Sequence, residues 1–194
     1  MLNVLLLTGS PRPYGCSSSL AEVALEGMRE AADIQVERVD AARLENKYRG
    51  CSSCYGCQPA KFRCMIHDAT ARLINRISDF QYIVLATPIY FFNISGQLKA
   101  CTDRFMALCS YEDQGKVISP LQKIRLAAVV TSEGDAETSG LEVVELWLKW
   151  LSDFTGTAPI PILHKGNCCR DAGPAVREEE LREKALAFGR SLIQ

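Results

Sequence analysis

The architecture of this chain can be inferred from the stretch Asn3-Val-Leu-Leu-Leu-Thr8-Gly9-Ser10-Pro11-Arg12-Pro13-Tyr14-Gly15-Cys16-Ser17-Ser18-Ser19. Its first part is a short, continuous apolar run, which is typical of a strand covered on both faces in a parallel sheet. Its second part is a loop rich in hydroxyl groups. Apolar residues then recur at helical spacing, at Leu20, Ala21, Ala24, Leu25 and Met28. The sequence therefore predicts a strand, a polar loop and a helix in succession.

This succession is the geometry in which backbone N–H groups and a helix dipole hold a phosphate. The loop contains neither G-x-x-x-x-G-K-[ST] nor G-x-G-x-x-G, so we expect neither a nucleoside triphosphate nor a Rossmann dinucleotide. Hydroxyl groups in place of a lysine suit a phosphate monoester, such as that of FMN. The alternative is an ordinary helix N-cap with serines around it.

Further strands and helices alternate along the rest of the chain. The strands are expected at 34–40, 80–87, 123–131 and 158–163, and the helices at 68–78, 95–110, 138–154 and 174–193. Neither a repeat nor a long low-complexity linker interrupts them. We therefore predict an α/β three-layer sandwich with a five-stranded parallel sheet of order 2-1-3-4-5, built by right-handed crossovers.

The loop after the third predicted strand, Pro88-Ile-Tyr-Phe-Phe-Asn93, is unusually aromatic. In a sheet of order 2-1-3-4-5, the ligand crevice lies between the first and third strands, at their carboxyl ends. The serine-rich loop and the aromatic loop should therefore lie side by side. Three rings in this position favour a planar ligand, and ordinary core packing is the alternative.

Four of the nine cysteines lie close together in Cys51-Ser-Ser-Cys54-Tyr-Gly-Cys57-Gln-Pro-Ala-Lys-Phe-Arg-Cys64. Four thiolates suit either tetrahedral Zn or a [4Fe–4S] cluster. The compact C-x2-C-x2-C run favours the cluster, because a structural Zn site more often has two separate C-x2-C pairs. Free thiols or disulfides are the third possibility. The segment follows the second strand's carboxyl end, so we expect it to approach the ligand crevice.

Composition limits the remaining classes. The chain has 194 residues, 47% hydrophobic content and a net charge of −1, and we expect one domain, 1–194, with a cysteine-rich insert at about 47–66. No run of Lys or Arg indicates nucleic acid or a membrane surface as a partner. No apolar run approaches a membrane span, and residues 1–8 do not resemble a signal peptide. An odd number of cysteines without a secretion signal indicates a reducing, cytoplasmic location.

The predicted helix at 138–154 carries two apolar stripes. One contains Leu141, Val144, Leu148 and Leu151, and the other contains Val143, Trp147, Trp150 and Phe154. A surface helix needs only one such stripe to cover a sheet. The second stripe would expose a large apolar area, so we expect a homodimer or a homotetramer.

Three motifs resemble those of one family. The string Thr8-Gly-Ser-Pro-Arg12, with Ser17 and Leu20, resembles the phosphate loop of the flavodoxin-like NADPH-dependent FMN reductase superfamily. The strings Ala86-Thr-Pro-Ile-Tyr-Phe, Ser95-Gly-Gln-Leu-Lys99 and Asp103-Arg104 resemble its second flavin loop and the helix behind it. With the cysteine run between these motifs, nearly the whole chain is similar to the iron-sulfur flavoprotein branch.

The resemblance implies a flavodoxin-like fold, an FMN cofactor and a [4Fe–4S] cluster. The FMN phosphate would be surrounded by Ser10, Arg12, Ser17, Ser18 and Ser19. The isoalloxazine ring would lie along Pro88, Ile89, Tyr90 and Phe91, and a third loop matches more weakly at Thr131, Glu133 and Gly134. The cluster ligands would be Cys51, Cys54, Cys57 and Cys64. Cys16 and Phe92-Asn93 depart from the pattern of the relatives, which often have Asn at the first position and a small residue at the second.

Three functions remain open. The first is an FMN-dependent oxidoreductase with a [4Fe–4S] cluster, which takes electrons from NAD(P)H or a ferredoxin-like donor and reduces quinones, oxygen species or other small acceptors. The second is an NAD(P)H-dependent FMN or quinone reductase without a cluster. The third is a flavodoxin-type electron carrier. His67 and His164 lie in no catalytic motif, so no catalytic side chain is predicted.

Overall fold

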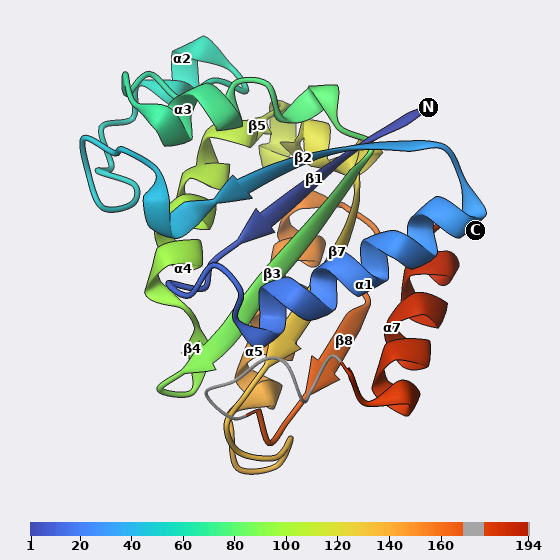
Figure 1. The fold of residues 1–194 in the computed structure, drawn as a ribbon. Coiled ribbons are helices and arrows are strands. Elements are labelled where there is room, and N and C mark those ends of the chain that lie inside the picture. The colour runs from blue at the N-terminus through green and yellow to red at the C-terminus, as the bar shows by residue number, and fades with distance from the viewer. Residues whose placement is uncertain (169–176, 194) are drawn as a thin grey trace.

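A computed structural model describes residues 1–168 and 177–193 of the chain (Figure 1). Its central sheet has the strand order β2-β1-β3-β7-β8, with parallel pairing throughout this series. The predicted order 2-1-3-4-5 is therefore confirmed. The bounds are β1 Leu2–Thr8, β2 Ile34–Asp40, β3 Tyr82–Tyr90, β7 Arg125–Thr131 and β8 Ile162–Lys165.

Helices cover both faces of this sheet (Figure 1). One face carries α1 Cys16–Ala31 and α7 Glu179–Leu192, and the other carries α3 Ala69–Ile74, α4 Gly96–Thr102 and α5 Leu141–Thr155. The short helix α2 Cys57–Ala60 belongs to the cysteine segment. The remaining elements are the β-strands β4 Asn93–Ile94, β5 Ser110–Tyr111 and β6 Val117–Ile118, and the 3-10 turns Ala41–Arg43, Ile77–Asp79, Asp103–Leu108, Asp113–Gly115 and Pro120–Lys123.

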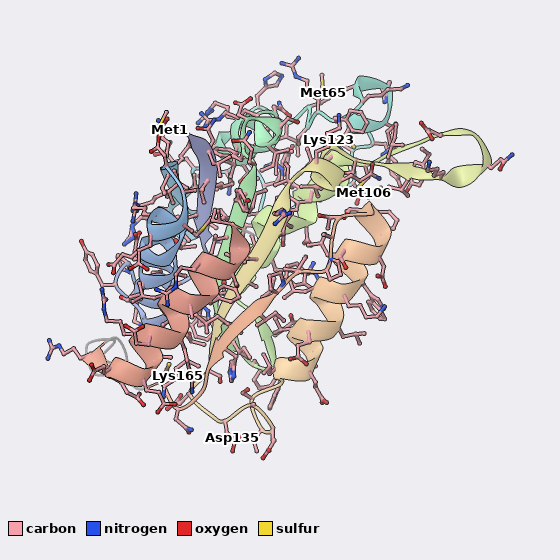
Figure 2. All side chains as sticks on the ribbon, turned by 90° about the vertical axis from the view of Figure 1, so that its right-hand side faces the viewer. Met1, Met65, Met106, Lys123, Asp135 and Lys165 are labelled. Carbon is pink, nitrogen blue, oxygen red and sulfur yellow. The ribbon has the colours of Figure 1, made fainter. Side chains whose placement is uncertain are left out.

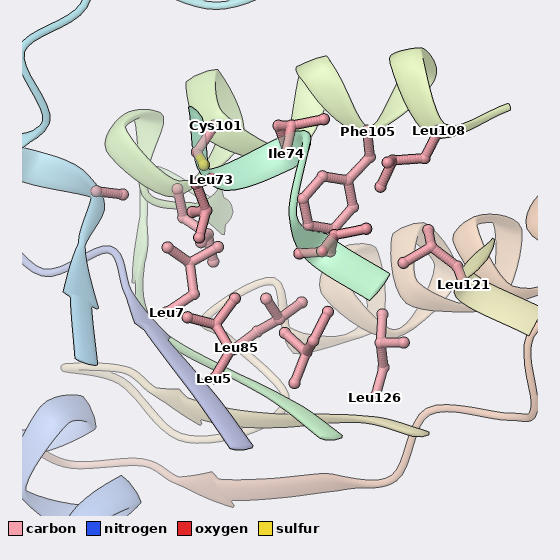
Figure 3. Packing of buried hydrophobic residues seen from close by; sticks show 14 of the residues in the cluster. Leu5, Leu7, Leu73, Ile74, Leu85, Cys101, Phe105, Leu108, Leu121 and Leu126 are labelled. Carbon is pink, nitrogen blue, oxygen red and sulfur yellow. The ribbon is translucent and has the colours of Figure 1, made fainter. Parts of the chain in front are cut away.

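The first strand shows why the chain forms a three-layer sandwich. Successive side chains of a strand point to opposite faces, so a strand covered on both sides needs a continuous apolar run. Leu5 and Leu7 join the core beneath α3, α4 and α5 (Figure 3), whereas Val4 and Leu6 join the core beneath α1 and α7. The flavodoxin-like α/β fold predicted from the sequence is confirmed.

Helices α1 and α7 cross at very short range (Figure 2 shows α7 on the near side of the sheet). A Cβ atom on Gly189 would lie 1.8 Å from the Ala24 carbonyl oxygen, and one on Gly27 would lie 2.1 Å from the Leu186 carbonyl oxygen. Only glycine fits at these two positions. The close crossing fixes α1 against the sheet and so fixes the loop that precedes it.

Several predicted boundaries differ from the structure. Helix α1 already begins at Cys16, so Ser17, Ser18 and Ser19 lie in its first turn and not in the loop. Strand β3 continues to Tyr90 because Thr87 and Pro88 still pair with β7. The last strand begins at Ile162 and not at residue 158, because the prolines before it have no N–H group to donate.

The helices predicted at 68–78 and 95–110 are shorter than expected, since α3 ends at Ile74 and α4 ends at Thr102. The predicted start of the last helix, Pro174, lies outside the described residues, and α7 begins at Glu179. Among the described residues, no helix combines the length and the apolar character needed to cross a membrane.

Candidate functional site

An open cavity of about 650 Å³ lies at the carboxyl ends of β1, β3 and β7. Three segments that are far apart in the sequence form its walls: the loop after β1, the end of β3 and the loop after β7. The lining residues are Ser10, Pro11, Arg12, Cys16, Pro88, Ile89, Tyr90, Thr131, Ser132, Glu133 and Cys168. The serine-rich loop and the aromatic segment thus lie side by side, where the sheet topology predicts a ligand crevice.

Hydrogen bonds to the sheet and to α4's N-cap fix the start of the loop after β1 at Gly9. The Gly9 N–H donates to the Ala86 carbonyl at 2.8 Å, and the Ser95 hydroxyl donates to the Gly9 carbonyl at 2.6 Å. The Arg12 N–H donates to the Ser10 hydroxyl at 3.2 Å. No side chain caps the N-terminus of α1, whose N-cap is Gly15. The first-turn N–H groups of a helix have no partners within the helix, so this end of α1 is suited to bind an anion beside the cavity.

The predicted phosphate-binding residues fall into two groups. Ser10 and Arg12 line the cavity, whereas Ser17 and Ser18 are buried in the first turn of α1 and are not among its lining residues. The Ser19 hydroxyl donates to the Tyr14 carbonyl at 3.4 Å. The serines of this turn are thus placed to shape the helix N-terminus.

The predicted ring-binding residues also divide. Pro88, Ile89 and Tyr90 line the cavity, but Phe91 lies beyond it, at the tip of a hairpin formed by β3 and β4. Phe91 is 95% exposed, and both Phe91 and Phe92 have positive φ angles, of 48° and 68°. Such angles are strained for bulky side chains. A strained aromatic tip at the mouth of a cavity is typical of a ligand-binding element.

The third wall depends on Ser132, which the sequence analysis did not select. Its hydroxyl donates to the Gly134 carbonyl at 2.8 Å, and it lies 2.9 Å from Nε2 of His164 on β8. A hydroxyl has one proton, so His164 Nε2–H is the donor in the second contact. Burial lowers the pKa of His164, although the charge of Glu145 opposes this shift.

Backbone hydrogen bonds hold this wall against the chain that follows β8. The Cys168 N–H donates to the Ser132 carbonyl at 2.9 Å, and the Asn167 N–H donates to the Gly134 carbonyl at 3.1 Å. Thr131 and Glu133 line the cavity on either side of Ser132, while Gly134 supplies only the accepting carbonyl. Local sequence gave no signal for His164, because its contact joins residues 32 positions apart.

The four candidate metal ligands differ in environment. Cys51 and Cys54 are exposed, Cys57 is partly buried and Cys64 is buried. None of these four forms a disulfide. Among the described residues, no three His, Cys, Asp or Glu side chains converge as a single metal ion would require. In a cubane cluster each thiolate binds a different iron, so the sulfur atoms need not converge on one point.

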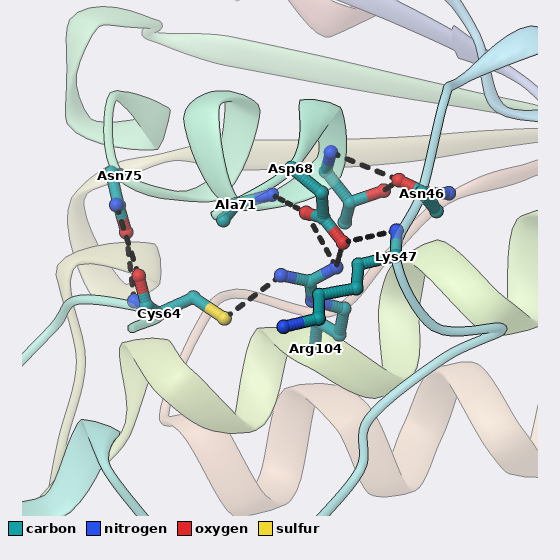
Figure 4. A network of polar contacts seen from close by, with 8 residues as sticks. Asn46, Lys47, Cys64, Asp68, Ala71, Asn75 and Arg104 are labelled. Atoms are coloured by element: carbon teal, nitrogen blue, oxygen red, sulfur yellow. Dashed lines mark hydrogen bonds and ion pairs between the residues drawn. The ribbon is translucent and has the colours of Figure 1, made fainter. Parts of the chain in front are cut away.

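The end of the cysteine segment is held by a buried ion pair (Figure 4). Arg104 Nη1 lies 2.8 and 2.7 Å from the two carboxylate oxygens of Asp68, and these side chains are only 1% and 3% exposed. Asp68 also accepts from the N–H groups of Ala71 and Lys47, at 2.9 and 3.1 Å. It therefore joins the two ends of the insert and caps the N-terminus of α3.

The same guanidinium reaches a candidate ligand, since Arg104 Nη2 donates to Cys64 Sγ at 3.0 Å. Burial opposes the charged forms of both partners, yet their hydrogen bonds prevail: the pKa of Asp68 is lowered and that of Arg104 is raised. Arg104 Nε is buried and has no hydrogen-bond partner among the residues that the structure describes. An orphaned donor beside a thiol, within a set of four thiols, fits an anionic iron-sulfur cluster.

The position of the cysteine segment differs from expectation. Phe62 lines a separate cavity of about 520 Å³ together with Phe80, Gln81 and Ile124. These three residues come just before the amino ends of β3 and β7, at the sheet edge opposite the first cavity. Figure 1 shows α2 and α3 far from the β3–β4 hairpin. We expected this segment to approach the ligand crevice, and for its Phe62 end that expectation is wrong. After β2 the chain turns back toward the amino ends of β3 and β7.

Helix α5 carries both predicted stripes. Val144 and Leu148 are buried against the sheet, and Trp147 packs at the edge of the same core. The prediction that Trp147 belongs to the exposed stripe is therefore wrong. The exposed large apolar side chains of α5 are Val143 (39%), Leu146 (45%), Trp150 (62%) and Phe154 (46%).

The doubly wound sheet and the cavity at its switch point define a flavodoxin-like α/β protein. Residues 2–164 match the model of the NADPH-dependent FMN reductase family, and the chain belongs to this family. The predicted membership of the flavodoxin-like FMN reductase superfamily is therefore confirmed.

Two curated relatives are iron-sulfur flavoproteins. The chain is 31% identical over 100 residues to one from Archaeoglobus fulgidus, covering 52% of this chain and 44% of the relative. It is 31% identical over 105 residues to one from Methanocaldococcus jannaschii, covering 53% and 51%. The matches thus span about half the length of these relatives. They bear out the predicted similarity to the iron-sulfur flavoprotein branch.

Solved structures support the fold. An FMN-dependent NADH-azoreductase from Bacillus anthracis, in complex with FMN, superposes with a TM-score of 0.73. The alignment covers 99% of this chain and 100% of that one, at 13% sequence identity. At this identity the likeness establishes the shared fold alone.

Proposed function

We propose that this chain is an electron-transferring FMN oxidoreductase that also carries a [4Fe–4S] cluster and reduces small acceptors such as quinones or oxygen species. The observation that carries the proposal is the cavity at the switch point of the sheet, which Ser10, Arg12 and Tyr90 line from two adjacent strands. NAD(P)H or a ferredoxin-like protein is the proposed electron donor.

The residues around the cavity have distinct proposed roles. Ser10, Arg12 and the uncapped N-terminus of α1 bind the phosphate, with Ser17, Ser18 and Ser19 shaping that helix end. Pro88, Ile89 and Tyr90 position the isoalloxazine ring, and Phe91 covers the cavity mouth. Thr131, Glu133 and Gly134 form the third side. Bound FMN supplies hydride or single-electron transfer, so no side chain needs to act as a catalytic acid or base.

Cys51, Cys54, Cys57 and Cys64 are the proposed cluster ligands. Their spacing, the absence of disulfides among them and the orphaned Nε of Arg104 support this assignment. The names of the two curated relatives support it as well. A cluster supplies one electron at a time, which suits exchange between two-electron and one-electron partners.

Three further proposals concern the whole molecule. Residues 1–194 form one domain with a cysteine-rich insert at about 47–66, and the protein works in the reducing cytoplasm.

The exposed side of α5 joins two copies in a homodimer, or four in a homotetramer, because Trp150 and Phe154 would otherwise leave apolar area in water. Trp150→Glu should give monomers by light scattering while Arg29→Glu on α1 does not. A wild-type protein already monomeric at micromolar concentration contradicts this.

The function is tested with anaerobically purified protein. NAD(P)H should bleach the flavin absorption, and a quinone should restore it with steady turnover. Turnover without iron would instead indicate an FMN or quinone reductase without a cluster. Flavin that accepts electrons but passes them to no small acceptor would indicate a flavodoxin-type carrier.

A further inference from the structure

The side chain of Arg104 carries more hydrogen-bonding capacity than the ion pair with Asp68 uses. Nη1 serves both carboxylate oxygens of Asp68, and Nη2 donates to Cys64 Sγ at 3.0 Å. Nε is buried without a partner. In a planar guanidinium, Nε–H and one Nη2–H point to the same side, which is the side used in bidentate binding. The unused donor therefore faces the side on which Cys64 lies.

A buried, charged donor without an acceptor is costly, and native proteins rarely leave one. Water and backbone could satisfy such a group elsewhere, but Arg104 is only 1% exposed. An anionic or strongly polar acceptor beside Cys64 would satisfy this donor. A cluster bound to Cys64 meets both conditions, because its sulfur atoms accept hydrogen bonds.

We propose that Arg104 is a positioning residue of the cluster site, whose Nη2–H and Nε–H form a fork that holds Cys64 Sγ and a second sulfur of the cluster. This inference rests on the cluster assignment proposed above. Hydrogen bonds to sulfur stabilise the more negative, reduced cluster and raise its reduction potential. Asp68 limits this effect, since its carboxylate neutralises most of the Arg104 charge.

The structure predicts opposite effects for two substitutions. Arg104→Lys keeps the charge beside Asp68, but one ammonium group cannot form the fork, so the cluster's midpoint potential should become more negative. Asp68→Asn keeps the fork and removes its counter-charge, so the potential should become more positive. Arg76→Lys, in an exposed ion pair with Glu37, is the matched control and should leave the potential unchanged.

The experiment is anaerobic spectroelectrochemistry of the whole protein, with iron and sulfide measured per chain and folding checked by circular dichroism. Shifts of opposite sign in the two variants support the inference. Loss of iron from a folded Arg104→Lys protein that still binds FMN also supports it. Unchanged potentials in folded variants with full iron content overturn it. If Arg104→Lys does not fold, the sign of the Asp68→Asn shift decides.

A second measurement uses cluster-free protein and does not depend on the cluster. Alkylation followed by mass spectrometry should modify the exposed Cys51 and Cys54 much faster than Cys64, and Arg104→Lys should change the rate of modification of Cys64 alone. Equal reactivity of Cys64 in both proteins counts against the positioning role. Absence of iron from the wild-type protein is a separate result that overturns the cluster assignment and, with it, this inference.

Discussion

The cavity at the carboxyl ends of the strands and the cysteine segment are built in different ways. The cavity is formed by loops that leave a buried parallel sheet, and short hydrogen bonds fix its first loop at Gly9. The cysteine segment lies outside the sheet, and four of its non-glycine residues have positive φ angles: Ser53, Tyr55, Lys61 and Phe62. Its main anchor within the core is the Asp68–Arg104 ion pair with Cys64.

The two regions are therefore held in place by different kinds of interaction. The sheet provides the cavity before any ligand binds, because burial of its strands already stabilises the surrounding loops. The cysteine segment has strained backbone and exposed thiols, so its conformation depends on a few buried polar contacts. We therefore expect changes at the anchor to affect the segment and leave FMN binding intact, and changes at the cavity to do the reverse.

The largest expected effect is that of Arg104→Leu. Removing one partner of a buried ion pair leaves an unpaired charge, so the free energy of unfolding should fall by roughly 3–5 kcal/mol. Urea unfolding measures this, and the exposed Arg76→Leu should cost less than about 1 kcal/mol. FMN affinity of the folded Arg104→Leu protein should stay unchanged. A large loss of FMN affinity would show that the two regions are not independent.

A change at the cavity should have a smaller effect on energy but a clear one on the flavin. Arg12→Glu places an anion where we propose the phosphate, and losing a charge-assisted hydrogen bond costs roughly 1.5–3 kcal/mol, or about tenfold to a hundredfold in the dissociation constant. Titration of apoprotein with FMN measures it. Arg29→Glu, an exposed change near the end of α1, should have little effect. If Arg12→Glu binds FMN as tightly as Arg29→Glu does, the phosphate does not lie beside Arg12.

The smallest expected effect concerns His164. Its pKa is lowered in the folded protein by burial, so the folded state binds protons less readily than the unfolded chain. The resulting loss of stability is absent at pH values above the ordinary pKa of about 6.5 and grows as the pH falls through it. Wild type should lose stability relative to His164→Gln between about pH 7 and about pH 5. A pH-independent stability difference between the wild type and His164→Gln would contradict the prediction.

The regular part of the molecule was predictable because its determinants are local. Continuous apolar runs such as Asn3–Thr8 mark strands buried on both faces, and the alternation with helices then restricts the strand order. The cavity followed from this order, since Ser10 and Tyr90 lie just where adjacent strands end.

Other features depend on contacts that local sequence does not reveal. The Arg104–Cys64 bond joins residues 40 positions apart, so the neighbourhood of neither residue reveals the contact. The hairpin turn at Phe91 and Phe92 could not be expected from residue type, because bulky residues rarely adopt positive φ angles. After β2 the chain is held by the ion pair between Asp68 and Arg104. The sequence position at which the cysteine segment starts therefore did not reveal that Phe62 lies at the amino-end edge of the sheet.

The central claim is that one chain holds FMN at the sheet edge and a cluster on a separately anchored cysteine segment. Its most direct test is the content of flavin, iron and acid-labile sulfide after anaerobic purification of wild type and Cys54→Ala. We predict one FMN with about four iron and four sulfide in the wild type, and FMN without the full cluster in the variant. Zinc in place of iron, or loss of FMN together with the cluster in Cys54→Ala, would contradict the account.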